Sequence, residues 1–138
     1  MNAPGQSGPE LLEITANAGV VHARQTVRAL AQACRLSLVE QTKLITAASE
    51  LARNTLIHGG GGTMTASLIE QHGRRGVRLV FADQGPGIPD IDLALTDGWT
   101  SGSGMGLGLS GSKRLVDDFV LDTTPGHGTT ITVTKWAR

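Results

Sequence analysis

The sequence predicts an α+β protein, a two-layer α/β sandwich in which a mixed, mostly antiparallel sheet is covered on one face by helices. Apolar residues first recur at helical spacing in two long segments, whereas later segments alternate in hydropathy as the strands of two hairpins do. A glycine-rich region separates the hairpins. The 138 residues are enough for one domain with its own core. We therefore expect a flexible segment over residues 1–10 and a single domain over residues 11–138.

The N-terminal part of the chain predicts a short edge strand and a first helix. Residues 11–14 form a short apolar run typical of an edge strand. Helical spacing begins after Asn17 and Gly19 and ends near Leu36. The residues expected on the buried side of this helix are Val21, Val27, Leu30, Ala31 and Cys34. A buried Cys34 would have no catalytic role.

A second helix should begin after Ser37. Ser37 and Glu40 have the spacing of a capping box, in which each side chain satisfies a free backbone N–H at the helix start. Four consecutive glycines from residue 59 should end the helix. On the helical wheel, Glu50 and Asn54 project together from the face opposite the apolar stripe. A carboxylate and an amide are thus expected one turn apart on one face.

The rest of the chain predicts two hairpins with a helix between them. Residues 63–70 and 76–82 alternate in hydropathy on either side of a polar turn. A second hairpin is expected over residues 120–136, with its turn at Pro125 and Gly126, and a helix is expected over residues 109–118. Helices on one face of a sheet made from these hairpins give the predicted sandwich.

The composition excludes several classes of function. Twelve Lys and Arg balance twelve Asp and Glu, so no net charge attracts nucleic acid or an anionic membrane. Two Phe, two Trp and no Tyr leave few side chains that could stack on bases. The sequence has neither a membrane-spanning apolar run nor the apolar core of a signal peptide, and its single cysteine cannot form an internal disulfide. We expect a cytoplasmic protein without nucleic acid or membrane partners.

Two glycine-containing segments are candidates for nucleotide contacts. Asp83 follows a buried strand, and Gly85 and Gly87 would allow a tight turn that leaves the carboxylate free to accept a hydrogen bond from an exocyclic amine. An ordinary Asp-x-Gly turn is the alternative interpretation. The second segment precedes a helix and could present backbone N–H groups to phosphate oxygens. Its candidate residues are Gly104, Met105, Gly106, Leu107, Gly108 and Leu109.

The second segment matches neither of two common phosphate-binding motifs. It lacks the Gly-Lys-Ser/Thr ending of a Walker A loop, and no strand precedes it at the spacing of a dinucleotide-binding fingerprint. A flexible loop is therefore the competing interpretation. What favours a nucleotide site is the order of four motifs along the chain. These are Glu50 with Asn54, Asp83 with Gly85 and Gly87, the glycines at 104, 106 and 108, and Gly128 with Thr129 and Thr130.

This combination resembles the Bergerat-fold ATPases, the superfamily of gyrase, Hsp90, MutL and histidine kinases, over nearly the whole chain. None of the four histidines is followed by an acidic residue, as the phosphoacceptor histidine of a histidine kinase would be. Within the superfamily the chain is most similar to the small stand-alone serine kinases that regulate bacterial sigma factors, in particular the stressosome switch kinase. The segments that carry this likeness include ELARNTLIHGGGG and GTTITVTKW.

The resemblance implies ATP and Mg²⁺ as cofactors and a role for each motif. Asn54 would bind the Mg²⁺ that bridges to the phosphates, and Asp83 would accept a hydrogen bond from the adenine amino group. Glu50 would be the general base that removes the proton from a serine hydroxyl. Thr129, with Thr130 as a second candidate, would support Asp83 from the neighbouring strand.

The function implied is that of a protein-serine kinase in a partner-switching pathway that controls a bacterial sigma factor. Its substrate would be a STAS-domain antagonist protein, and a PP2C-type phosphatase would be a second partner. An anti-sigma factor that sequesters a sigma factor, with nucleotide as a conformational ligand, is the alternative from another class. An ATPase that uses water as the acceptor shares every motif. The sequence sets neither the oligomeric state nor the identity of the substrate.

Overall fold

A five-stranded antiparallel sheet forms one layer of the protein. The computed structural model describes residues 9–88, 91–95 and 108–138. Within these ranges the strand order is β1-β2-β3-β5-β4, and every neighbouring pair is antiparallel, so the described sheet has no parallel component. The strands are β1 (Glu10–Ile14), β2 (Gly62–Gln71), β3 (Arg74–Asp83), β4 (Asp118–Thr123) and β5 (Thr129–Trp136).

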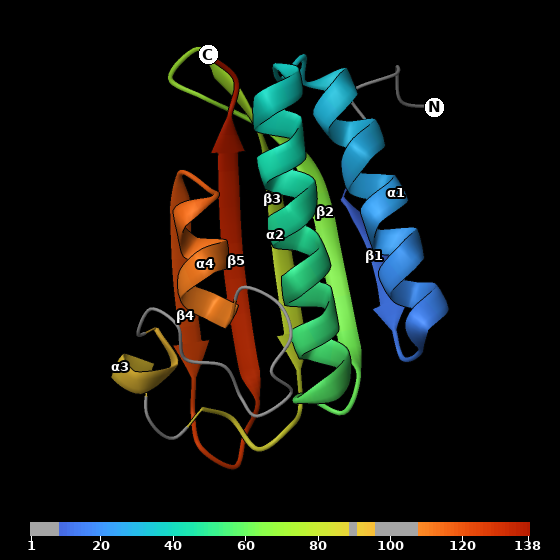
Figure 1. Ribbon diagram of the computed structural model, residues 1–138. Coiled ribbons are helices and arrows are strands. Elements are labelled where there is room, and N and C mark those ends of the chain that lie inside the picture. The colour runs from blue at the N-terminus through green and yellow to red at the C-terminus, as the bar shows by residue number, and fades with distance from the viewer. Residues whose placement is uncertain (1–8, 89–90, 96–107) are drawn as a thin grey trace.

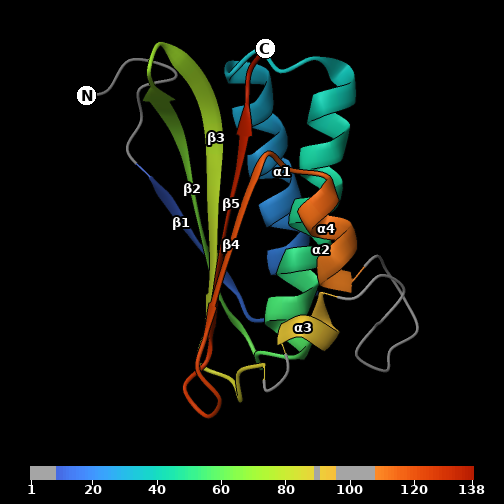
Figure 2. The ribbon, with the colours of Figure 1, turned by 90° about the vertical axis from the view of Figure 1, so that its left-hand side faces the viewer.

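The helices form the second layer and cover one face of the sheet. They are α1 (Asn17–Ala33), α2 (Leu38–Ile57), α3 (Ile91–Ala94) and α4 (Gly108–Arg114). Figure 1 shows α2 over the middle of the sheet, with α1 on the β1 side and α4 on the β4 side. In the turned view, α1, α2 and α4 all lie on the same side, and no described element covers the other face (Figure 2). The predicted two-layer α/β sandwich is confirmed.

The hydrophobic core lies between the two layers. Because strand residues point alternately to opposite faces, every second residue of the sheet contributes to this core. The buried strand residues are Leu12, Ile14, Met64, Ala66, Val77, Leu79, Phe81, Ile131 and Val133. From the helices they meet Val20, Ala23, Val27, Ala31, Leu44, Ala48, Leu51 and Ala52. Removing this apolar surface from water, at about 25 cal/mol per Å², is the main force that holds the layers together.

The first helix has the predicted buried stripe except at Val21, and it ends earlier than predicted. Val21, expected on the buried side, is 50% exposed, whereas Val20 is buried with the residues three or four positions apart from it on the same stripe. One residue turns the helix by about 100°, so Val21 lies off the stripe that Val20 shares with Val27 and Ala31, both of which are buried as predicted. The helix ends at Ala33, and Arg35 adopts a left-handed backbone with φ 63° that turns the chain.

The second helix begins where the capping pattern predicts, but only half of the capping box forms. The Ser37 hydroxyl accepts a hydrogen bond from the Glu40 N–H at 3.2 Å. The Glu40 carboxylate instead forms an ion pair with the ammonium of Lys135, which is only 4% exposed. The same ammonium lies 3.8 Å from Asp117 Oδ1 and donates to the Leu115 carbonyl at 3.2 Å. These contacts link the start of α2, the chain after α4 and the end of β5.

The element before the second hairpin is shorter than expected. The predicted helix over residues 109–118 is α4, which ends at Arg114, and β4 already begins at Asp118. The Asp117 N–H donates to the Thr134 carbonyl at 2.9 Å, so sheet contacts begin where helical spacing still continues in the sequence. Within the described ranges, no helix combines the length and the hydropathy needed to cross a membrane.

Candidate active site

A transverse row of residues crosses all five strands at the end of the sheet that lies beside the C-terminus of α2 (Figure 1). In register, Ile14 lies opposite Gly62, Gly62 opposite Asp83, Asp83 opposite Thr129, and Thr129 opposite Thr123. Residues directly opposite one another point to the same face of a sheet. The side chains of Asp83, Thr129 and Thr123 therefore lie side by side on the face that the helices cover.

Asp83 is a buried carboxylate with one oxygen held in place. It is 7% exposed, and its Oδ1 accepts a hydrogen bond from the Gly85 N–H at 2.9 Å. A buried charge is costly unless hydrogen bonds compensate it, and this bond also fixes the plane of the carboxylate. Within the described part of the chain no donor reaches Oδ2. That oxygen can accept a hydrogen bond from a ligand, as the sequence predicts for this residue.

Glycines allow three backbone segments to approach Asp83 closely. A Cβ atom on Gly59 would lie 2.5 Å from Cβ and Cγ of Asp83, and one on Gly85 would lie 2.8 Å from the Cα of Gly59. A Cβ on Gly128 would collide with the Asp83 carbonyl oxygen. Local sequence predicts Gly59 only as a helix stop. Its contact with Asp83 depends on how α2 packs on β3, which no local pattern encodes.

Glu50 and Asn54 lie one turn apart on the same side of α2, as predicted, but this side is not opposite the buried one. Ala47, on the same side, is fully buried, and both polar residues are half-buried. Packing of α4 against α2 widens the covered part of the helix beyond the apolar stripe. The backbone carbonyl of Asn54 accepts hydrogen bonds from the N–H groups of His58 at 2.9 Å and Gly59 at 3.2 Å. The end of α2 that carries Asn54 thus continues directly into the glycine that contacts Asp83.

Strand alternation decides between the two candidate threonines. Thr129 is buried and lies opposite Asp83, whereas Thr130 lies opposite Ala82 and points to the uncovered face of the sheet. The structure therefore brings Thr129 to Asp83 and leaves Thr130 on the other side.

The glycine-rich segment of residues 104–109, which the sequence predicts to contact phosphate, is described only in part. Gly108 begins α4, and the side chain of Leu109 is 7% exposed and belongs to the hydrophobic core, so only its backbone could contact a nucleotide. The predicted contacts of Gly104, Met105, Gly106 and Leu107 lie outside the described residues.

The loop after Asp83 is attached to the turn between β4 and β5. The N–H of Gly126 donates to the Pro86 carbonyl at 2.7 Å, and the N–H of Ile88 donates to the Thr123 hydroxyl at 2.9 Å. Gly87 lies between these two points with a left-handed φ of 78° that a non-glycine residue would rarely adopt. The sequence predicts roles for Gly85 and Gly87 but not for Thr123, because a threonine near the end of a strand is explained by β-propensity alone.

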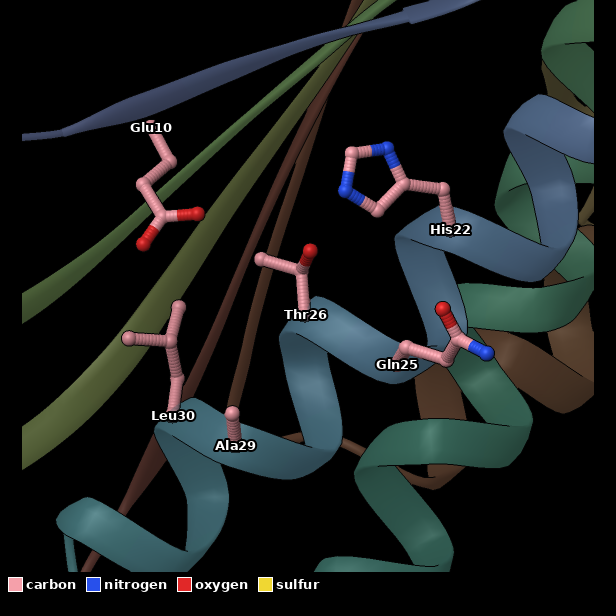
Figure 3. A pocket seen from close by; sticks show the side chains of 6 residues that line it. All are labelled: Glu10, His22, Gln25, Thr26, Ala29 and Leu30. Atoms are coloured by element: carbon pink, nitrogen blue, oxygen red, sulfur yellow. The ribbon is translucent and has the colours of Figure 1, made fainter.

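A separate hollow lies near the opposite edge of the sheet, between β1 and α1. Figure 3 shows Glu10 on the strand and the other lining side chains on the helix. Its volume is about 280 Å³, and its lining residues are Glu10, His22, Gln25, Thr26, Ala29 and Leu30. None of the predicted site residues lines it, so it is distinct from the Asp83 region.

The donor set beside Asp83 and α2 fits a magnesium nucleotide. Mg²⁺ usually binds one or two protein oxygens and completes its shell with water and substrate phosphates. The described residues contain no group of three His, Cys, Asp or Glu side chains placed to hold a metal ion. The side-chain oxygen of Asn54 is a suitable single ligand for an ion that arrives with its phosphates.

Comparison with known proteins identifies the family. Residues 39–138 match the family described as histidine kinase-, DNA gyrase B- and HSP90-like ATPases. The chain belongs to this family. The predicted superfamily is confirmed, and ATP is the nucleotide that its members use. Because the match begins in α2 and continues through β5, it includes every motif for which the sequence predicts a nucleotide contact.

Individual relatives place the chain among bacterial regulatory kinases. It is 41% identical over 119 residues to the serine/threonine-protein kinase RsbT of Bacillus subtilis (strain 168), covering 86% of this chain and 90% of the relative. It is 34% identical over 121 residues to the anti-sigma F factor of Bacillus licheniformis, covering 82% of this chain and 81% of the relative. The predicted likeness to sigma-regulating serine kinases is confirmed.

A solved structure shares the fold. It is the crystal structure of the RsbU and RsbW domains of Rv1364c from Mycobacterium tuberculosis, which matches with a TM-score of 0.65 at 21% identity. The match covers 96% of this chain and 34% of that longer chain. At this identity the likeness concerns the fold alone, and it agrees with the predicted α+β sandwich.

Proposed function

We propose that the protein is an ATP- and Mg²⁺-dependent protein-serine kinase that phosphorylates a STAS-domain antagonist protein in a partner-switching pathway of a bacterial sigma factor. One observation carries this proposal. Asp83, a buried carboxylate whose Oδ2 receives no donor from the described residues, lies beside the C-terminal end of the helix that carries Glu50 and Asn54, in a chain 41% identical to a serine/threonine-protein kinase. The Asp83 carboxylate suits a purine amine, and Glu50 together with Asn54 suits phosphoryl transfer.

The base-binding end of the site is assigned to Asp83. With Oδ1 held by the Gly85 N–H, Oδ2 would accept a hydrogen bond from the amino group of adenine. Guanine has a carbonyl oxygen at that position, which a carboxylate repels, so this residue would favour ATP over GTP. Thr129, next to Asp83 in the sheet, would support the same contact.

We assign the phosphoryl-transfer part of the site to Glu50 and Asn54. Glu50 would take the proton from the serine hydroxyl as the serine oxygen bonds to the γ-phosphorus and the bond to the leaving ADP oxygen breaks. Mg²⁺ bound with ATP would neutralise charge on the phosphates, and the amide oxygen of Asn54 would hold it. Backbone N–H groups of residues 104–109 would contact the phosphates, as the sequence pattern predicts.

The likeness to anti-sigma F factors supports one alternative, a protein that sequesters a sigma factor and uses nucleotide as a conformational ligand. The two functions differ in whether a partner protein becomes phosphorylated. In the proposed pathway, phosphorylation of the antagonist would release the kinase to a second partner, a PP2C-type phosphatase.

The decisive experiment incubates the protein with γ-labelled ATP, Mg²⁺ and candidate STAS-domain proteins. Glu50→Gln keeps the size of the side chain and removes the general base. We therefore expect about 10²- to 10⁴-fold slower phosphoryl transfer with ATP binding retained. Glu70→Gln, an exposed change near the far end of β2, is the matched control and should match the wild type. Unchanged transfer by Glu50→Gln would remove Glu50 from its role. Label released only as phosphate, with no protein labelled, would indicate hydrolysis by water instead.

A further inference from the structure

Thr123, the last residue of the edge strand β4, contacts three groups near Asp83 through a single hydroxyl. This oxygen accepts the N–H of Ile88 at 2.9 Å and lies 3.1 Å from the Gly128 carbonyl oxygen and 2.9 Å from the Thr129 hydroxyl. A hydroxyl has one proton and two lone pairs. With Ile88 as a donor, the proton of Thr123 can go either to the Gly128 carbonyl or to Thr129.

These contacts join the two segments that flank the Asp83 carboxylate. Ile88 ends the described part of the loop that starts at Asp83 and contains Gly85, whose N–H holds Oδ1. Thr129 lies directly opposite Asp83 in the sheet. Thr123 therefore fixes the loop on one side of the carboxylate and the strand residue on the other.

We propose that Thr123 is a positioning residue for the base-binding end of the nucleotide site. It acts through Thr129 and through the loop that carries Gly85, and it does not itself touch the nucleotide. The inference rests on the proposed ATP site at Asp83.

Either hydroxyl can be the donor in the contact between Thr123 and Thr129, so Thr129 could contact a ligand as a donor or as an acceptor. When Thr123 donates to Thr129, the proton of Thr129 is free to be donated to the ligand. When Thr129 donates to Thr123, its lone pairs are free instead. The neighbouring Asp83 carboxylate can only accept. Adenine presents a donor amine beside an acceptor ring nitrogen, so a fixed acceptor next to an adjustable hydroxyl matches its edge.

Thr123→Val tests the hydroxyl without changing the shape of the side chain. Valine keeps the β-branching that suits a strand. It leaves the Ile88 N–H without its acceptor and the Thr129 hydroxyl without its hydrogen-bond partner on Thr123. Thr123→Ser restores the hydroxyl. Thr132→Val makes the same chemical change on the uncovered face of the sheet, where Thr132 lies between Val80 and Val120, and is the matched control.

Calorimetric titration with ATP and with ADP gives the first readout. We expect Thr123→Val to weaken both nucleotides by about tenfold, because both carry the same base. Thr123→Ser and Thr132→Val should bind both as the wild type does. In phosphotransfer assays the KM for ATP should rise by a similar factor, while kcat at saturating ATP should stay near that of the wild type.

The possible failures are distinguishable. Wild-type ATP and ADP affinity in Thr123→Val would overturn the positioning role and leave the ATP site in place. A fall in kcat with unchanged KM, or a loss of affinity that Thr123→Ser does not restore, would also overturn it. No binding of ATP by the wild type would overturn the proposed function and this inference together. Thermal unfolding without nucleotide verifies that each variant is folded, and Thr123→Ala provides a second variant without the hydroxyl.

Discussion

Replacing Gly59 by alanine should disturb the Asp83 carboxylate more than it disturbs the rest of the protein. The added Cβ would lie 2.5 Å from Cβ and Cγ of Asp83, about 0.9 Å closer than the 3.4 Å at which ordinary van der Waals contact begins. The φ of Gly59 is not in the left-handed region, so the backbone accepts alanine without strain. The collision with Asp83 is therefore the effect that the substitution isolates.

The size of the effect follows from what must move. A shift of about 0.9 Å would stretch the 2.9 Å hydrogen bond from the Gly85 N–H to Oδ1 beyond hydrogen-bonding range. Overpacking costs about 1–3 kcal/mol, and alanine returns about 0.4–1 kcal/mol by restricting the unfolded chain. We expect the free energy of unfolding to fall by about 1–2 kcal/mol. Because the carboxylate proposed to bind adenine is displaced, ATP should bind at least about tenfold more weakly.

Two measurements test this expectation against a matched control. Urea unfolding gives the stability, and calorimetric titration gives the affinity for ATP. Gly73→Ala, in the turn between β2 and β3, has open space but a left-handed φ of 77°, so it should cost about 1–2 kcal/mol through backbone strain alone. It should bind ATP as the wild type does. If Gly59→Ala bound ATP with wild-type affinity, the argument that Gly59 positions the carboxylate would be refuted.

Two further changes test the neighbouring assignments. Asp83→Asn should weaken ATP binding by about tenfold or more, because an amide can turn a donor group toward the adenine amine; equal affinities measured by calorimetry would contradict the base-binding role of Asp83. Hydrogen bonding and charge from Lys135 hold the pKa of Glu40 below its ordinary value of 4.5. This pair therefore stabilises the fold above pH 4.5 and loses its contribution as the pH falls through the lowered pKa. Urea unfolding from about pH 6 to pH 3 should show a steeper loss of stability for the wild type than for Glu40→Gln, and identical slopes would exclude the pair as a source of acid sensitivity.

Features that depend on neighbours in the chain could be predicted from sequence. Ser37 caps α2 because its side chain needs only the Glu40 N–H three residues later. The Glu50 and Asn54 pair follows from helical geometry, and both hairpins follow from alternation and turn residues. The fold class could be predicted because the helical spacing and the two hairpins all indicate a sheet covered by helices.

Features that depend on tertiary packing could not be predicted. Glu40 fits a capping box in sequence, but its carboxylate pairs with Lys135, a residue from the other end of the chain. Thr123 reaches Ile88 and Thr129 only because the sheet register brings them together. The choice between Val20 and Val21 is different, because helical spacing from Val27 already favours Val20, seven residues earlier on the same stripe. The end of α4 is also set by the sheet contact of Asp117 and not by helical spacing.

The glycine contacts around Asp83 limit how this site can evolve. Any side chain added at Gly59, Gly85 or Gly128 would collide with Asp83 or with another backbone segment beside it, and these glycines come from three different parts of the chain. Because Asp83 is the proposed contact to adenine, a change of base preference would need coordinated substitutions in several segments, since single changes displace the carboxylate first.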